Sequence, residues 1–317
     1  MKSSQETAQK IVTNIQNVIV GKSDVVELAV ICLLCQGHLL IEDVPGVGKT
    51  MLARSLAQSL GCSLGRIQFT PDMLPSDVTG VSIYNQNTHE FEFRPGPVMS
   101  EIVLADEINR ATPKTQSALL EAMQERQVTV DSVSHKLPPL FMVLATQNPI
   151  EHEGTFRLPE AQLDRFLMRI KIGYPGEADE VNILDRQKYE HPIEKIEAVV
   201  SVEDVLDAQK TVREIYIAPA LTDYIVNLVQ QTRAHEDVYL GASPRGSLSL
   251  YRASQARAML RDRDFVIPDD IKSLADSILM HRMILAPGAH LQDVSAESII
   301  NEILERVAVP GGEYLAP

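Results

Sequence analysis

LLIEDVPGVGKT, the stretch of residues 39–50, decides the fold of this chain. It starts with an apolar run of the kind found in buried strands, and a glycine-bearing turn then ends in Gly-Lys-Thr. Such a turn brings backbone N–H groups close to phosphate oxygens, while the lysine reaches the terminal phosphates and the threonine hydroxyl binds Mg²⁺. Leucines at four-residue steps follow directly, so we expect an amphipathic helix whose positive dipole end faces the phosphates.

The phosphate loop departs at one position from the general pattern G-x-x-x-x-G-K-[ST]. Asp43 stands where the pattern has its first glycine. Asp tolerates unusual backbone angles better than most residues, so the turn remains possible, but a carboxylate near a triphosphate needs a cationic or water neighbour. The residues expected to contact the nucleotide along this loop are Val44, Pro45, Gly46, Val47, Gly48, Lys49, Thr50 and Met51, with Thr50 also at the metal.

The sequence EIVLADEINR, residues 101–110, carries two adjacent acids after mostly apolar residues. This pattern predicts a buried parallel strand that delivers carboxylates at its C-terminal end. Asp106 is expected to hold Mg²⁺ through its water shell, and Glu107 to orient and polarise the water that attacks the γ-phosphate. An acidic loop after a core strand is common by itself, so this interpretation depends on the phosphate loop in the same chain.

Three polar residues later in the chain are candidates to complete a nucleotide site. Asn148 follows an apolar run, where its amide could sense the γ-phosphate or position the water. Arg165 in PEAQLDRF and Arg245 in SPRG are candidates for stabilising transition-state charge, the first in a neighbouring subunit and the second on its own nucleotide. Considered alone, each arginine would have a solvated or salt-bridged surface role.

These motifs, in this order, resemble those of AAA+ ATPases and, more closely, those of the MoxR family. The matching segments are DVPGVGKT, LADEINRA, ATQNPIEHEGTFRLPEAQLDRF and GASPRGSLSL, and the similarity extends from about residue 18 to the C-terminus. The resemblance implies that Lys49 and Thr50 are the Walker A pair. It likewise implies that Asp106 and Glu107 are the Walker B pair.

The same resemblance assigns roles to the remaining polar residues. Asn148 matches sensor 1, Arg165 the arginine finger and Arg245 sensor 2. Arg110 is a rival for the trans-acting role, and the sequence does not rank it against Arg165. The segment NVIVG lies where such ATPases hold the adenine, although by itself it is equally consistent with an ordinary helix end. The residues expected to contact the base are Val20 and Gly21.

Two segments predict β-hairpins that interrupt the α/β pattern. Residues 81–94 alternate around a polar turn, and residues 127–141 lie between the acidic strand and the strand before Asn148. By resemblance they are the helix-2 insert and the pre-sensor hairpin. In the rings formed by the clade of AAA+ ATPases that includes the MoxR family, these hairpins face the pore or the substrate side. Surface hairpins without a function are the alternative, although isolated hairpins are only marginally stable.

Length and composition predict two domains, since 317 residues with 44% hydrophobic content can fill two cores. The expected fold class is α/β, a P-loop NTPase of AAA+ type. A parallel-sheet αβα core with the two β-hairpin inserts occupies residues 1–175, and a smaller all-α lid occupies residues 176–317. The boundary follows GYPG, after which the pattern turns helical. Such a plan places the nucleotide in the crevice between sheet and lid.

Charge and apolar content limit the partners. The formal net charge of −14 argues against nucleic acid, and the five arginines of residues 245–263 are better explained by a solvated helix face with one nucleotide contact. No apolar run is long enough for membrane insertion and the N-terminus lacks the apolar region of a signal peptide, so we expect a cytoplasmic protein. Cys32 and Cys35 are expected to be inert core residues rather than metal ligands.

The sequence therefore predicts an ATPase whose cofactors are ATP and Mg²⁺. The resemblance implies a homo-oligomeric ring, a hexamer, that performs chaperone-like remodelling or maturation of partner proteins, including proteins with a von Willebrand factor A domain. Three alternatives remain. They are a chelatase-type motor subunit for metal insertion into a tetrapyrrole, a nucleic-acid motor stimulated by DNA or RNA, and a switch in which ATP only orders a scaffold.

Overall fold

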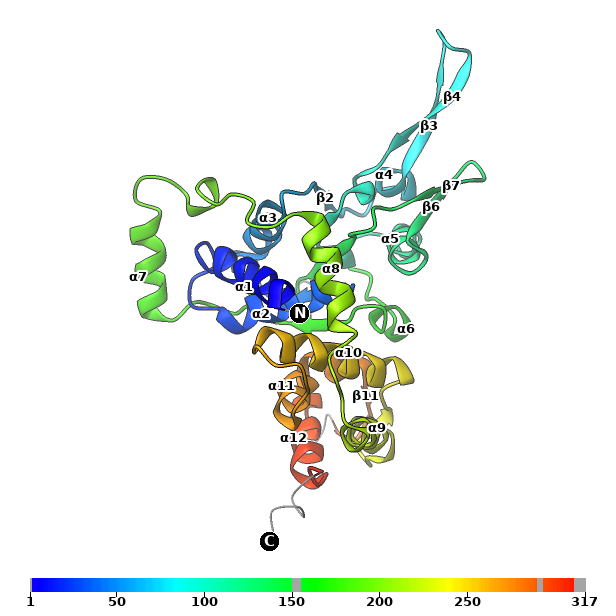
Figure 1. Ribbon diagram of the computed structural model, residues 1–317. Coiled ribbons are helices and arrows are strands. Elements are labelled where there is room, and N and C mark those ends of the chain that lie inside the picture. Colours follow the sequence, from blue (N-terminus) through cyan, green and yellow to red (C-terminus); the bar gives the residue numbers. More distant parts are fainter. Residues whose placement is uncertain (1, 150–154, 290–292, 311–317) are drawn as a thin grey trace.

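A five-stranded parallel sheet forms the centre of the N-terminal part of the chain (Figure 1). The computed structural model describes residues 2–149, 155–289 and 293–310. The strand order is β2-β5-β8-β1-β9, and every pairing is parallel, so all carboxyl ends lie at one edge of the sheet. The strands are β1 (Leu39–Glu42), β2 (Leu64–Gln68), β5 (Ile102–Asp106), β8 (Met142–Gln147) and β9 (Met168–Ile170).

Helices cover both faces of this sheet. Successive side chains of a strand point to opposite faces, and β1 accordingly places Leu39 and Ile41 in one hydrophobic core and Leu40 in a second one. The first core includes the apolar sides of α1, α2 and α3, and the second includes that of α5. The helices of this part are α1 (Lys2–Gln16), α2 (Ser23–Leu34), α3 (Lys49–Leu60), α4 (Pro75–Thr79), α5 (Pro113–Glu125) and α6 (Glu160–Leu163), with 3-10 turns at Pro97–Met99 and Ile108–Arg110.

Both predicted hairpins are present. They consist of β3 (Gly80–Asn85) with β4 (Glu90–Pro95), and of β6 (Gln127–Val130) with β7 (Val133–Lys136). The first hairpin projects from the body of the molecule, and the second extends beside it (Figure 1). The rings of Phe93 and His135 stack with centroids 3.8 Å apart, so the two hairpins touch each other near their bases.

Five further helices follow the sheet and confirm the helical pattern predicted beyond it. A capping box between Ser201 and Asp204 opens α8, and a proline stands in the first turn of α9, α10 and α11. The second domain is not purely helical, because β10 (Val238–Leu240) and β11 (Ile284–Leu285) pair antiparallel. The helices are α8 (Val202–Val212), α9 (Pro219–Ala234), α10 (Pro244–Leu260), α11 (Pro268–Leu279) and α12 (Ala296–Arg306), with 3-10 turns at Pro192–Glu194 and Met280–Arg282.

One more helix, α7 (Glu177–Arg186), stands apart from the body on one side of the molecule (Figure 1). It lies just after the boundary expected at residue 175, and that boundary remains a prediction. In the described ranges, no helix has the length and apolar character needed to cross a bilayer.

The lid docks at the amino edge of the sheet. Helix α8 packs on α1 and α2, where Ser4 Oγ lies 2.9 Å from Thr211 Oγ1 and Gln209 donates to the carbonyl of Leu33. The lid residue Arg282 reaches the carbonyls of Phe166 and Leu167, immediately before β9 begins. The expected crevice between the lid and the carboxyl ends of the strands is therefore wrong for this chain, because α8 carries the lid helices to the opposite edge.

Candidate functional site

The phosphate loop connects β1 to α3 at the carboxyl edge of the sheet. Gly46 and Gly48 have φ values of 87° and 93°, which few residues other than glycine adopt without strain. A Cβ atom at either glycine would meet nothing within 4 Å, so the backbone faces open space. The N-terminus of α3 begins directly after Gly48, at Lys49 and Thr50. A cradle of glycine backbone next to a helix N-terminus fits a phosphate group.

Asp43, which replaces the first glycine of the general pattern, stabilises the loop through hydrogen bonds. Its carboxylate accepts hydrogen bonds from the backbone N–H groups of Val44, Ile172 and Gly173, at 2.6–2.8 Å. The side chain is buried and points to the segment after β9 instead of the cradle. The expected conflict between this carboxylate and a triphosphate does not arise, because three backbone donors satisfy its charge.

Lys49 lies among three carboxylates. Its Nζ donates to the carbonyl of Asp43 at 2.6 Å. Partial burial lowers the pKa of Lys49, while the charges of Asp43, Asp106 and Glu107 act in the opposite direction. The cation is thus close to the acidic pair and to the loop, where it can bind the terminal phosphates.

The acidic pair is held by a buried threonine that the sequence did not single out. Thr146 Oγ1 donates to Asp106 at 2.7 Å and accepts from the backbone N–H of Glu107 at 2.9 Å. Glu107 has a φ of 55°, a left-handed conformation that costs a non-glycine residue free energy and needs such support. Thr146 is fully buried at the end of β8. The sequence did contain a signal for this role of Thr146, because it is a polar residue at the end of an apolar strand, two positions before Asn148.

Replacing Thr146 with valine keeps the shape of the side chain and removes both hydrogen bonds. Each lost bond costs about 1–3 kcal/mol when it leaves a buried group unsatisfied. We expect kcat to fall at least tenfold, with little change in the affinity for ATP, because the acids lose their position while the phosphate loop is untouched. Steady-state kinetics and a binding titration check this, with Thr146→Ser as the matched control that keeps the hydroxyl. Equal rates for the two variants would contradict the positioning role.

Three neighbours complete the surroundings of the acids. Arg66 on β2 forms an ion pair with Asp106 at 3.0 Å, and Gln68 donates to Glu107 at 2.8 Å. Arg110 bonds Glu107 within the same chain, at 3.1 Å. This contact gives the rival trans-acting arginine a partner in its own subunit.

Asn148 follows β8 at the same edge, next to Glu42 at the end of β1. Both residues line a cavity of about 320 Å³ together with Asn109 and Arg157. In the described chain, the side-chain oxygen of Asn109 is buried without a hydrogen-bond partner. The structure therefore brings Asn148, the phosphate loop and the acidic pair together at one edge, as the sequence predicted.

Val20 and Gly21 lie near this edge as well. Gly21 has a φ of 71°, and a Cβ atom there would collide with the carboxylate of Asp179. Lys22 next to it donates to the carbonyl of Tyr174 at 2.7 Å. Since Asp43 binds the backbone of residues 172–173, one short segment connects the expected adenine contacts with the phosphate loop.

Arg165 and Arg245 lie elsewhere, at the amino end of β1. Both line a depression of about 320 Å³ that also includes His38, the residue before β1. Arg165 donates to the carbonyl of Leu120 of its own chain at 2.8 Å, and its role towards a neighbouring subunit stays a prediction. The expectation that Arg245 folds onto the nucleotide of its own subunit is wrong for this structure, because the lid that carries Arg245 docks at the amino edge. The cations lining the depression are Arg126, Arg165, Arg245, Arg252 and Arg282, and Asp164 is the acid among its lining residues.

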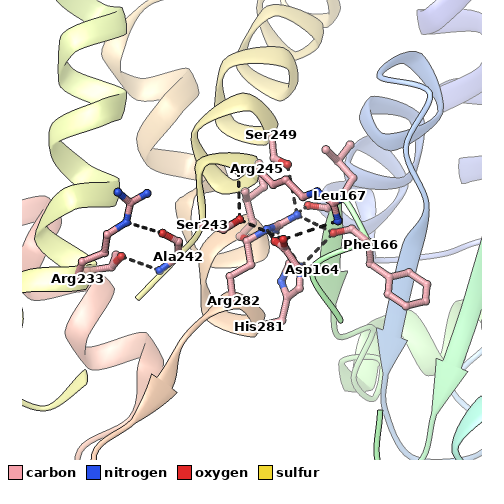
Figure 2. Close-up of polar contacts among 12 residues, drawn as sticks. Asp164, Phe166, Leu167, Arg233, Ala242, Ser243, Arg245, Ser249, His281 and Arg282 are labelled. Carbon is pink, nitrogen blue, oxygen red and sulfur yellow. Dashed lines mark hydrogen bonds and ion pairs between the residues drawn. The ribbon is translucent and has the colours of Figure 1, made fainter. Parts of the chain in front are cut away.

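Asp164 joins the core to the lid (Figure 2). Its carboxylate accepts from Arg282 Nε at 2.8 Å and from Ser243 Oγ at 3.0 Å. The Arg282 side chain is 2% exposed and also donates to the carbonyls of Phe166 and Leu167. Burial lowers the pKa of Arg282, and the charge of Asp164 opposes this change. Removing one partner of such a buried pair typically costs about 3–5 kcal/mol, so the pair is a strong clamp.

The arginines that looked like a basic cluster in the sequence are separated in the structure. Arg261 pairs with Glu27 at 2.9 Å, and Arg263 pairs with Asp270 at 2.6 Å. Only Arg245 and Arg252 of this set line the depression. The set therefore does not form one continuous basic surface.

Known proteins share this arrangement. Residues 38–168 match the ATPase family associated with various cellular activities (AAA), and residues 230–303 match the AAA lid domain. The chain is 56% identical to the uncharacterized protein YeaC of Bacillus subtilis, over 95% of this chain and 94% of that protein. It is 42% identical to the chaperone MoxR1 of Mycobacterium tuberculosis, over 96% of this chain and 82% of the relative.

A solved structure agrees with this similarity. The crystal structure of an inferred ATPase from Cytophaga hutchinsonii superposes with a TM-score of 0.90 at 39% identity, covering 97% of both chains. The relatives span almost the whole chain, and the phosphate loop and acidic pair stand where an ATPase of this fold needs them. The chain therefore belongs to the MoxR family of AAA+ ATPases and is an ATP-hydrolysing enzyme.

Proposed function

We propose that this chain works as a homo-oligomeric ring, a hexamer, in which each ATP site is completed by the next subunit. One observation carries the proposal. The phosphate loop and the acids lie at the carboxyl edge of the sheet, whereas Arg165 and Arg245 lie together at its amino edge. A single chain thus has two halves of a site on different sides, and head-to-tail contact between copies unites them.

Within one subunit, the residues have distinct tasks. The loop N–H groups and Lys49 bind the phosphates, and Thr50 and Asp106 would hold Mg²⁺, which neutralises charge on the phosphate oxygens when bound. Glu107, held by Gln68 and Arg110, accepts the proton of the attacking water. Asn148 orients that water. Val20 and Gly21 border the adenine.

The neighbouring subunit supplies the positive charge that the transition state needs. An arginine delivered to a γ-phosphoryl group in trans is worth about 10³–10⁵-fold in rate. We propose that Arg165 has this role and that Arg245 of the same neighbour joins it, since both line one depression.

Mixing of inactive subunits tests this arrangement. Arg165→Ala removes the arginine offered to a neighbour, whereas Glu107→Gln removes the base of a subunit's own site. Each variant alone is expected to be inactive, while equal mixing before ATP is added should make about a quarter of the sites complete. Arg245→Ala mixed with Glu107→Gln should recover the same share, whereas an Arg245 acting in its own subunit would recover nothing. No recovery in the Arg165 mixture would contradict a trans-acting finger.

The work done by hydrolysis is proposed from the relatives. MoxR1 is named a chaperone, which supports remodelling or maturation of partner proteins by this chain, with von Willebrand factor A domains among the expected partners. The formal charge of −14 and the separated arginines disfavour a nucleic-acid track. The cytoplasmic location remains a prediction.

A further inference from the structure

Helix α7 presents an apolar surface that no described part of its own subunit covers. In the described structure none of its residues is buried. Val181 is 56% exposed and Leu184 is 69% exposed, and their spacing puts them on one face of the helix. Tyr174 and Tyr189 flank the helix and are exposed as well. Four large apolar side chains within sixteen residues are more than the scattered surface hydrophobics of ordinary proteins.

The helix is too short to be stable by itself. Isolated helices below about 12–15 residues are marginal in water, and α7 has 10 residues. Polar contacts at its two ends hold it to the body, from Lys22 to the carbonyl of Tyr174 at 2.7 Å and from Arg186 to the carbonyl of Asn17 at 3.0 Å. These contacts fix the position of α7 beside Val20 and Gly21, the expected adenine contacts, which are called the adenine segment below. They leave the apolar face of α7 open.

The surface of α7 is also acidic. Residues 174–190 contain five acids and two bases. In the described part of the chain, the exposed carboxylates of Glu177, Glu180 and Asp185 form no ion pair. The carboxylate of Asp179 lies against Gly21 of its own subunit. A partner that covers α7 should therefore combine apolar and basic side chains.

The arginine-lined depression has both properties. Leu248 on α10 lines it and is 63% exposed. Arg126 and Arg252 line the same depression as Leu248. Arg126 donates to backbone carbonyls and Arg252 donates to the side-chain oxygen of Gln255, so the hydrogen bonds of both arginines go to neutral acceptors. These two arginines are not needed for the phosphate contacts assigned to Arg165 and Arg245.

The two surfaces lie on different sides of one chain. Helix α7 is at one side, and α6, which leads into Asp164 and Arg165 of the depression, is at the other (Figure 1). A chain cannot join these surfaces within itself, but a second copy can. Contact between two different patches of identical chains is head-to-tail, and repetition of such a contact gives a ring where the rotation between copies closes and an open filament where it does not.

We propose that α7 of one subunit docks into the depression of the next, with Val181 and Leu184 against Leu248. The exposed acids of α7, Glu177, Glu180 and Asp185, then face Arg126 and Arg252. The inference rests on the proposed ring and names the surfaces that build it. Because α7 adjoins the adenine segment of its own subunit, the same contact brings the neighbour's Arg165 towards the phosphates.

Assembly of two complementary variants tests the contact. Val181→Asp with Leu184→Asp damages the donor surface, and Leu248→Asp damages the acceptor surface. Each variant, incubated with ATP and Mg²⁺, is expected to need at least a tenfold higher concentration for assembly in sedimentation velocity. Val226→Asp on α9 is the matched control, since Val226 is likewise half-exposed, and it should assemble like the parent protein. Mixing the two damaged variants should give dimers and no ring, because one good contact remains per pair.

The outcomes separate this inference from the proposed ring. If the parent protein assembles and both damaged variants assemble equally well, the contact is wrong and the ring stands. The same conclusion follows if they assemble normally but lose stimulation by a client protein, since α7 would then face the client. A parent protein that stays monomeric would overturn both.

Chemical crosslinking gives a readout that does not depend on loss of function. Cys35 also lines the depression, so the crosslinking is done in a Cys35→Ser background. In that background Leu184→Cys together with Leu248→Cys should give a ladder of covalent multimers with a bismaleimide, whereas each single variant should stay near the level of the background protein. Absence of the ladder in an assembled ring would refute the contact.

Discussion

Replacing Glu107 with glutamine is expected to leave ATP bound while turnover falls about 10²–10⁴-fold, the usual contribution of a general base. The carboxylate is held by Gln68 at 2.8 Å and by Arg110 at 3.1 Å, so it is oriented before the water arrives. Glutamine keeps the size of the side chain and cannot accept the proton. Binding should be unchanged or tighter, because one negative charge near the phosphates is removed.

Two measurements on the Glu107→Gln variant check this expectation. Phosphate release gives the turnover, and a titration with a fluorescent ATP analogue gives the affinity. Glu203→Gln on α8 changes the same charge at an exposed position and should behave like the parent protein. Turnover at the parental rate would mean that Glu107 is not the base. A variant that traps ATP could also retain client proteins for their identification.

Replacing Lys49 with alanine is expected to abolish measurable nucleotide binding. Charge-assisted contacts contribute about 1.5–3 kcal/mol each, so losing two of them weakens binding roughly 10²–10⁴-fold. A second effect adds to this loss. Without the cation, the carboxylates of Asp106 and Glu107 remain near the phosphate loop and repel the triphosphate.

A control must show that the Lys49→Ala variant loses nucleotide binding without losing its fold. Arg54→Ala is the matched control, because Arg54 is exposed on the same helix, α3. Both variants should keep the circular dichroism spectrum and, within a few degrees, the melting temperature of the parent. Undiminished binding of a labelled ATP analogue by Lys49→Ala would show that the nucleotide does not use the cradle.

Local sequence patterns were sufficient for much of the fold and of the site. The phosphate loop, the Asp-Glu strand end and the first hairpin each depend on neighbours within a few residues, and the structure has all three. The capping box at Ser201 and the prolines that open later helices are equally local. Parallel strands then bring Asn148 and the acids to one edge as a consequence of topology.

Long-range contacts could not be read in the same way. The carboxylate of Asp43 is satisfied by residues more than a hundred positions later, and Thr146 supports acids that lie on another strand. The position of Arg245 depends on how α8 packs on α1, which sets the edge of the sheet where the lid docks. The surroundings of Asp43, Thr146 and Arg245 depend on contacts between elements that are distant in the sequence, and no periodic pattern in the sequence predicts such contacts.

The clamp at Asp164 has a consequence for how subunits communicate. Asp164 precedes Arg165 in the chain and grips Arg282 and Ser243 of the lid. In the proposed ring, a shift of Arg165 when the adjoining subunit releases its phosphate would therefore move the lid of the subunit to which Arg165 belongs. If the chain assembles as proposed, the Asp164 contacts would link one catalytic centre to the next in a single direction round the ring.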